Sequence, residues 1–127
     1  MTKLPCVWLL GLLCANVLAG DVICNPAVDI SAADVKEIFL GEKQLAGNVR
    51  IVPVDNAALQ DGFTSAVTGM DKSKYQGLWI RKSFRDGLTT PAVKGSDAEV
   101  IAFVRANAGA IGYVSAAPAG VKVVKKY

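Results

Sequence analysis

Few residues of this chain could carry out chemistry, and their types exclude the commonest catalytic and metal sites. The 127 residues include no histidine, and the three cysteines, Cys6, Cys14 and Cys24, lack the spacing of a zinc cluster. Serine triads and cysteine dyads need an imidazole base, so neither can form here. The best remaining acid pair is Asp55 and Asp61, and both positions also suit helix capping. We therefore expect no enzyme activity, no metal site and no cofactor.

One group of residues that could bind a small anion follows two predicted strands. It comprises Asn25 and Asn56 with the backbone N–H groups of Ala57 and Ala58. Such N–H groups at the start of a helix attract negative charge. The two asparagines equally suit a structural role, in which their side chains close turns or cap the backbone.

A second group lies at the end of a predicted helix and in the segment after it. Its members are Arg81, Lys82, Arg85, Thr89 and Thr90. Guanidinium and hydroxyl groups donate the hydrogen bonds that an oxyanion accepts. The alternative is that the cations lie in solvent, where they complement the negative end of the helix dipole.

The amino-terminal segment has the pattern of a secretory signal peptide. Lys3 gives it a positive start, and Leu4 to Leu13 form an apolar stretch too short to span a bilayer comfortably. Val17-Leu18-Ala19 offers small or modest residues where a signal peptidase cleaves. We predict a signal peptide over residues 1–19, cleaved after Ala19.

Cleavage would leave residues 20–127 as one periplasmic domain that does not span the membrane. An uncleaved anchor and lipidation at Cys14 are alternatives, although Leu13 stands where a lipoprotein signal needs a small residue. The mature chain would keep only Cys24, which we expect to be a buried, unreactive thiol in a strand, with a link between two chains as the alternative. Loss of Lys3 would reduce the cations from 14 to 13 against 11 acidic residues, and a net charge of +2 is too weak to indicate nucleic acid.

The rest of the sequence alternates short apolar runs with helical patterns. The predicted strands cover 22–24, 50–54, 110–114 and 121–124, and the predicted helices span 31–41, 55–69, 71–82 and 96 to about 107. Pro53 is expected to place its strand at a sheet edge or to end it early. Residues 83–95 are expected to form a surface loop. Strands separated by helices favour parallel pairing, so we predict an α/β fold with a small, mostly parallel sheet flanked by helices.

Apolar stripes at helical spacing are predicted to face the core. The stripes are Val35, Ile38 and Phe39; Leu59, Phe63 and Val67; and Tyr75, Leu78 and Trp79. Ser96 and Glu99 have the spacing of a capping box at the start of the last predicted helix.

Three segments carry a resemblance to a known family. They are Val35 to Gly41, Arg50 to Asp55, and Asn107 to Val114, whose Ala-Gly-Ala-Ile-Gly-Tyr-Val differs from the family pattern in having Ala108 in place of proline. Together they resemble one lobe of the type II periplasmic binding fold, in particular the phosphate-binding proteins of ABC importers. The opening strand and Asn25-Pro26 are also similar to small single-lobe relatives. The resemblance implies binding of a small anion such as phosphate and a transporter or envelope protein as partner.

The chain departs from that family at the turn that binds the anion. Family members have an arginine and then Gly-Ser-Gly-Thr after the second strand, whereas Asp55 to Asp61 here contain no serine, threonine or arginine. Carboxylates at both ends of this segment would oppose an anion. Removal of 19 of the 127 residues leaves 108, enough for only one lobe of a two-lobed binding protein. Two functions stay open: binding of a small anion, or service as a degenerate lobe that contacts an envelope protein or a second copy of itself.

Overall fold

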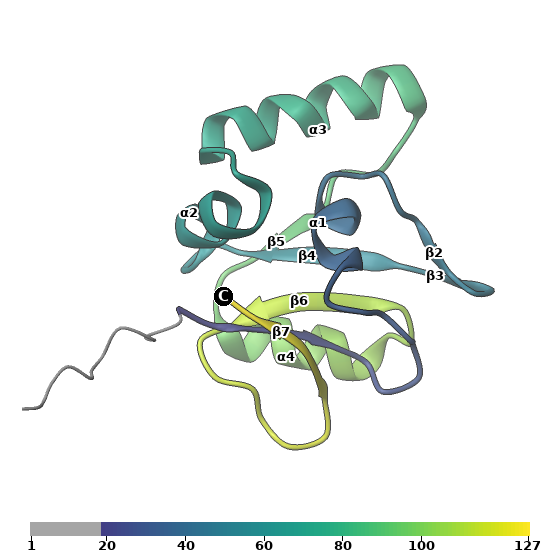
Figure 1. The fold of residues 1–127 in the computed structure, drawn as a ribbon, viewed down its shortest axis with the longest axis vertical. Helices are drawn as coiled ribbons and strands as arrows, with labels where there is room; N and C mark the ends of the chain where they lie inside the picture. Colours follow the sequence, from purple (N-terminus) through teal and green to yellow (C-terminus); the bar gives the residue numbers. More distant parts are fainter. Residues whose placement is uncertain (1–18) are drawn as a thin grey trace, which may run out of the picture.

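The computed structural model describes residues 19–127, which form a five-stranded sheet with helices on both faces (Figure 1). The predicted signal peptide lies outside the described residues except for Ala19. In chain order the elements are β1 (Asp21–Cys24), α1 (Asp34–Phe39), β2 (Leu45–Ala46), β3 (Val49–Arg50), β4 (Val52–Asn56), α2 (Gln60–Phe63), the π-helical turn η2 (Thr64–Thr68), α3 (Lys72–Asp86), β5 (Ala92–Lys94), α4 (Asp97–Ala106), β6 (Ala110–Val114) and β7 (Lys122–Lys126).

The strands of the sheet lie in the order β5-β4-β6-β1-β7. Strand β4 pairs in parallel with β5 and with β6, whereas β1 pairs antiparallel with β6 and with β7. Four strands therefore run in one direction and β1 alone runs in the other. The predicted α/β fold with a mostly parallel sheet flanked by helices is confirmed. Among residues 19–127, no helix is long and apolar enough to cross a membrane.

Successive side chains along a strand point to opposite faces of the sheet, and in the central strands both sets are apolar, so the sheet has two apolar faces. Val22 and Cys24 of β1 belong to the core beneath α1, α2, η2 and α3, while Ile23 belongs to a smaller core beneath α4. All five residues of β6 are buried, as is typical of a strand covered on both faces. Cys24 is fully buried with a free thiol, and burial raises its pKa, so the expected buried position is confirmed.

Aromatic rings fill the centre of the larger core. The rings of Phe63 and Tyr113 stack with centroids 3.7 Å apart, and Phe39 meets both rings edge-on. Tyr127 from the carboxyl terminus meets the Phe63 ring edge-on at 5.2 Å. Such pairs add to the stability that burial of the rings already provides. The predicted core positions on α1 and along the segment 59–67 are confirmed.

The predicted helix starts at Asp71 and Ser96 are confirmed, whereas α1 and α2 begin later than predicted and have no side-chain cap. The Asp71 side chain accepts a hydrogen bond from the Lys74 N–H at the start of α3. The Ser96 hydroxyl accepts from the Glu99 N–H at the start of α4, and Glu99 in turn accepts from the Gly95 N–H. These contacts satisfy N–H groups that have no partner inside the helix.

The prediction for Pro53 is wrong, because β4 lies between β5 and β6 and continues to Asn56. The Val52 N–H donates to the Gly109 carbonyl on the β6 side, so the main-chain nitrogen of residue 53 faces the β5 side. Strand β5 pairs with β4 only from Val54 onward. Proline is tolerated here because its nitrogen lies where no strand needs an N–H donor.

The loop predicted over residues 83–95 is confirmed for residues 87–91 and 95 but is wrong over 83–86 and 92–94. Helix α3 continues to Asp86, and residues 92–94 form the edge strand β5. The short β2 and β3 strands, joined through Gly47-Asn48 with Gly47 at φ 60°, were not predicted either. Strands of two or three residues are too short to show a periodic pattern, and their pairing defines them.

Close contact between α4 and the sheet depends on a glycine in β6. A Cβ atom added at Gly112 would lie 2.6 Å from Val100 Cγ1 of α4 and 3.1 Å from Val54 Cγ2 of β4. A side chain at this position therefore forces the helix away from the sheet.

We predict that Gly112→Ala lowers the free energy of unfolding by about 1–3 kcal/mol, because the added methyl group overpacks the smaller core. Urea denaturation measures the change. Gly62→Ala is the matched control, because nothing lies within 4 Å of a Cβ added at this position in α2. It should be neutral or raise stability by up to about 1 kcal/mol. Equal effects of the two substitutions would contradict the packing argument.

Candidate functional site

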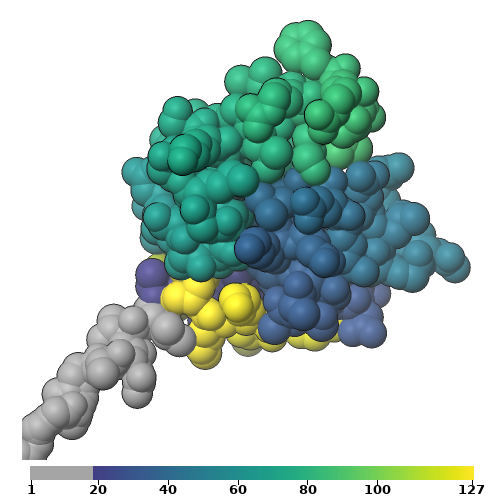
Figure 2. All heavy atoms as spheres, turned by 45° about the horizontal axis from the view of Figure 1, so that its top comes forward, coloured from purple at the N-terminus to yellow at the C-terminus, as the bar shows by residue number. Residues whose placement is uncertain are grey.

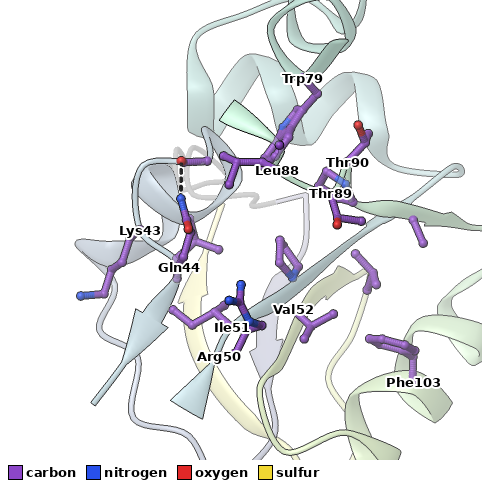
Figure 3. Close-up of a pocket in the computed structure, with 17 residues that line it drawn as sticks. Lys43, Gln44, Arg50, Ile51, Val52, Trp79, Leu88, Thr89, Thr90 and Phe103 are labelled. Carbon is purple, nitrogen blue, oxygen red and sulfur yellow. Dashed lines mark hydrogen bonds between the residues drawn. The ribbon is translucent and has the colours of Figure 1, made fainter. Parts of the chain in front are cut away.

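A cleft of about 440 Å³ opens beside the amino ends of β4 and β5 (Figure 3). Its volume falls in the range of small-molecule sites. The walls come from α1 and the turn after it, from the segment 50–54, from α3 with the following loop, and from α4; the lining residues are Ile38, Gly41, Lys43, Gln44, Arg50, Ile51, Val52, Pro53, Val54, Trp79, Gly87, Leu88, Thr89, Thr90, Pro91, Ala92 and Phe103.

The cleft exists because β5 is shorter than β4. Strand β5 covers β4 from Val54 to Asn56 and leaves the flank at Val52 and Pro53 without a neighbouring strand. Both of these residues line the cleft. Because Pro53 has no N–H, this open flank carries no unpaired donor at that position, and an apolar solute can lie against it.

Arg50 is the cation that faces this cleft. Figure 3 shows its guanidinium turned toward the middle of the cleft, with Thr89 and Thr90 on the far side. Its side chain is exposed and makes no ion pair or hydrogen bond with another residue of the described chain. Lys43 points away in the same view and lies 3.8 Å from an Asp34 carboxylate oxygen. The guanidinium therefore supplies a free positive charge in a setting that also offers two hydroxyl groups.

The other walls are apolar and held in place. The Trp79 indole N–H donates to the Phe39 carbonyl at 3.0 Å, which fixes the ring. The Lys94 ammonium lies 4.8 Å from the centre of the Phe103 ring on the opposite side of the sheet, an arrangement that favours a cation–π contact. Together with Leu88, these rings give the cleft a preformed apolar lining.

The carboxyl ends of the parallel strands β4, β5 and β6 lie at one end of the sheet, which we call its carboxyl edge. The predicted anion donors at this edge already have hydrogen-bond partners inside the protein. Asn56 is fully buried, and its amide donates to Asp97 Oδ1 at 2.8 Å and to the Tyr113 carbonyl at 3.0 Å. The Ala57 N–H donates to the Lys94 carbonyl, and the Ala58 N–H donates to the Asn56 side chain. Any anion at this position would have to compete with these bonds.

Asp97 brings a carboxylate of the protein itself to this edge. It accepts hydrogen bonds from the Ser115 N–H, from the Ser115 hydroxyl and from the Asn56 amide. Burial raises the pKa of Asp97, but these hydrogen bonds outweigh burial and hold the pKa below its ordinary value. The donors that converge on this edge thus already surround a negative charge.

The other predicted residues do not come together at one site. Asn25 lies at the opposite edge of the sheet from Asn56, because β1 runs against the direction of β4. Its amide donates to the Val104 carbonyl at 2.9 Å, and its oxygen accepts from the Ala27 N–H. Both asparagine side chains are therefore bonded within the protein, as expected if their role is to close turns or cap the backbone.

Of the predicted cationic group, only the threonines reach the cleft. Arg81 and Arg85 lie exposed on α3, and Arg85 pairs with Asp86 at 3.3 Å, whereas Thr89 and Thr90 line the cleft. Arg50 was not predicted as a site residue, because it stands next to an apolar strand segment. The proline three residues later was the available signal that this flank stays open.

A buried carboxylate lies within the larger core, near the carboxyl end of β4. Asp55 is 1% exposed and accepts hydrogen bonds from the Tyr75 hydroxyl at 2.9 Å and the Tyr113 hydroxyl at 2.8 Å. Neither donor is cationic, so burial dominates and raises the pKa of Asp55 to about 6. The carboxylate links α3 to β6 and lies too deep to serve as the helix cap expected at this position.

Comparison with known proteins places the fold. No protein-family model matches the chain, and no curated protein matches it either. A solved structure from Clostridium perfringens, described as a phosphate ABC transporter substrate-binding protein with bound phosphate, is similar with a TM-score of 0.61 and 20% identity over 85% of this chain. An ABC-type phosphate transport receptor from Vibrio cholerae is similar with a TM-score of 0.63 and 17% identity over 85% of it.

The match covers less than half of either structure. This chain spans 44% of the first protein and 46% of the second. The predicted likeness to one lobe of a type II periplasmic binding protein is therefore confirmed as a likeness of fold. At 17–20% identity the ligand does not follow from the fold.

We predict that Asp55→Asn changes how stability depends on pH. The pKa of Asp55 is about 6 in the native protein and 3.8 for an ordinary aspartate. Between these two pH values the native protein therefore keeps a proton that the unfolded chain has lost. The stability that Asp55 contributes is complete below about pH 4 and is lost as the pH rises through 6. Relative to the variant, the wild type should lose up to about 3 kcal/mol over this range.

Urea denaturation at a series of pH values measures this difference. Asp61→Asn, at an exposed position on α2, controls for the loss of one carboxylate. Parallel stability curves for the wild type and Asp55→Asn would show that the native protein does not hold this proton.

Proposed function

We propose that this protein is a solute-binding protein of the cell envelope that takes a small anion in the cleft at Arg50. The observation that carries the proposal is the Arg50 guanidinium, which faces an open cleft with no acidic partner among the described residues. Thr89 and Thr90 lie across the cleft as hydrogen-bond donors. A charge-assisted bond to a guanidinium is among the stronger polar contacts a small ligand can make.

The contacts at the carboxyl edge argue against that edge as the anion site. Phosphate placed beside Asn56 would meet the Asp97 carboxylate and would have to replace its bonds to Ser115. Like charges at such short range repel strongly. We therefore place the anion at the amino ends of the strands, where Asn56, Ala57 and Ala58 take no part.

The sequence pattern of residues 1–19 supports export to the periplasm. The two similar structures are named as phosphate-binding components of ABC transport. By analogy, we infer a transporter or another envelope protein as the partner that receives the solute, and we infer no catalytic role.

We predict that millimolar small anions raise the melting temperature of the protein in a saturable way, because only ligands that bind the native state stabilise it. Arg50→Gln should weaken anion binding by about 10- to 100-fold, the value of one charge-assisted hydrogen bond. Thermal denaturation across phosphate, sulfate and small carboxylates gives the affinities.

Lys74→Gln is the matched control, because it removes one positive charge from an exposed site at the start of α3 that does not line the cleft. It should leave anion affinity within about twofold. A folded protein that responds to no anion would overturn the proposal, as would an Arg50→Gln variant that binds as the wild type does.

A second candidate function, service as a protein-interaction lobe, is favoured by an exposed apolar surface on α3 and β5. Phe84 and Ile80 are 88% and 58% exposed on α3, which forms the upper ridge in Figure 2, and Val93 on the edge strand is 54% exposed. Such exposure often marks a contact with another protein. Sedimentation at rising concentration tests the homodimer: self-association that Phe84→Ser abolishes, without a change in anion response, would favour this function.

A further inference from the structure

We infer that the anion bound in this cleft is an organic monocarboxylate with an apolar body, and not an inorganic oxyanion. The inference rests on the proposed function and names the class of solute. It follows from how charge and apolar surface are distributed around the cleft, and each of these points to the same chemistry.

The charge of the cleft matches one negative charge. Arg50 is free, whereas Lys43 points away and has Asp34 as an ion-pair partner at 3.8 Å. A carboxylate can accept two parallel N–H bonds from one guanidinium, which satisfies both of its oxygens. Sulfate or doubly charged phosphate would bring a second negative charge, and Lys43, the one other cation among the described residues that line the cleft, is paired with Asp34. A monoanion is therefore the better match.

The rest of the cleft favours an apolar body attached to that carboxylate. Apart from the polar Lys43, Gln44, Arg50, Thr89 and Thr90, the lining is apolar: Val52, Leu88 and Phe103 keep accessible surface, whereas Ile38 and Trp79 are almost fully buried. Burial of a ligand methylene against such walls is favourable, while a compact, fully hydrated oxyanion gains nothing from them. The cavity of about 440 Å³ is also much larger than phosphate needs.

The apolar wall is already in place before a solute binds. The Trp79 ring is fixed by its bond to the Phe39 carbonyl, and a Cβ atom added at Gly41 would lie only 2.9 Å from Trp79 Cη2. The indole thus packs directly on the backbone of residue 41. A preformed wall does not have to be ordered on binding, which preserves affinity for the apolar part of the solute.

The experiment is a titration of the purified protein with acetate, butyrate, hexanoate and benzoate, in which calorimetry or NMR chemical shifts report binding. Inorganic phosphate and sulfate are measured beside them, and hexanol serves as the uncharged analogue of hexanoate. We expect affinity to rise about two- to fourfold for each methylene that enters the cleft, and hexanoate to bind more tightly than phosphate.

Two variants separate the contributions of charge and apolar surface. Arg50→Gln should weaken hexanoate at least tenfold and leave hexanol unchanged. Leu88→Ala should reduce the gain per methylene, whereas Leu45→Ala, an exposed leucine outside the cleft, should not. A circular dichroism melt of each variant verifies that it is folded.

The outcomes distinguish this inference from the proposed function. One outcome would overturn the monocarboxylate inference but keep the proposal of an anion-binding protein. In that outcome, phosphate or sulfate binds through Arg50 as tightly as hexanoate does, and affinity does not depend on the number of carbon atoms in the carboxylate. Hexanoate and hexanol binding equally, without regard to Arg50, would overturn both proposals, as would no binding of any compound.

Discussion

Close approach of chain segments along β6 is the constraint on which the rest of the structure depends. A side chain at position 109 would overlap the Arg50 carbonyl, and the Val52 N–H donates to the Gly109 carbonyl. Three residues later, Gly112 lets Val100 of α4 reach the sheet. These contacts set where β4 begins, so they also set where Arg50 enters the cleft. A larger spacing between β6 and its neighbours would therefore shift Arg50 relative to Thr89 and Thr90 on the other wall of the cleft.

The same contacts explain why the resemblance predicts the fold better than the ligand. The segment Asn107 to Val114 carries much of that resemblance, and Gly109, Gly112 and Tyr113 each have a packing role. Tyr113 stacks on Phe63 and donates to Asp55 in the core. Residues that act in packing specify how the chain folds and leave the solute unspecified. The free cation of the cleft, Arg50, lies outside this segment.

Local signals made much of the fold predictable, and distant pairing accounts for the remainder. Caps at Asp71 and Ser96 and the apolar stripes of the helices act within a few residues, so the sequence displays them directly. Strand β5 exists because Ala92 to Lys94 pair with β4, some 38 residues earlier in the chain. The cleft likewise brings together residues that are far apart in the sequence. Thr89 and Thr90 were predicted to act with the nearby Arg81 and Arg85, but the cation across the cleft from them is Arg50.

The two ends of the strands differ in charge. At the carboxyl edge, Asp97 occupies the donors of Asn56 and Ser115, and Asp55 lies buried behind them, so an incoming anion meets negative charge. At the amino edge, the missing strand beside Pro53 opens a cleft that Arg50 faces. Both effects act in the same direction, because one edge repels what the other attracts. In this lobe the free guanidinium therefore lies at the end of the strands opposite to these carboxylates, so a scaffold of this fold can present positive charge at the end away from Asp97.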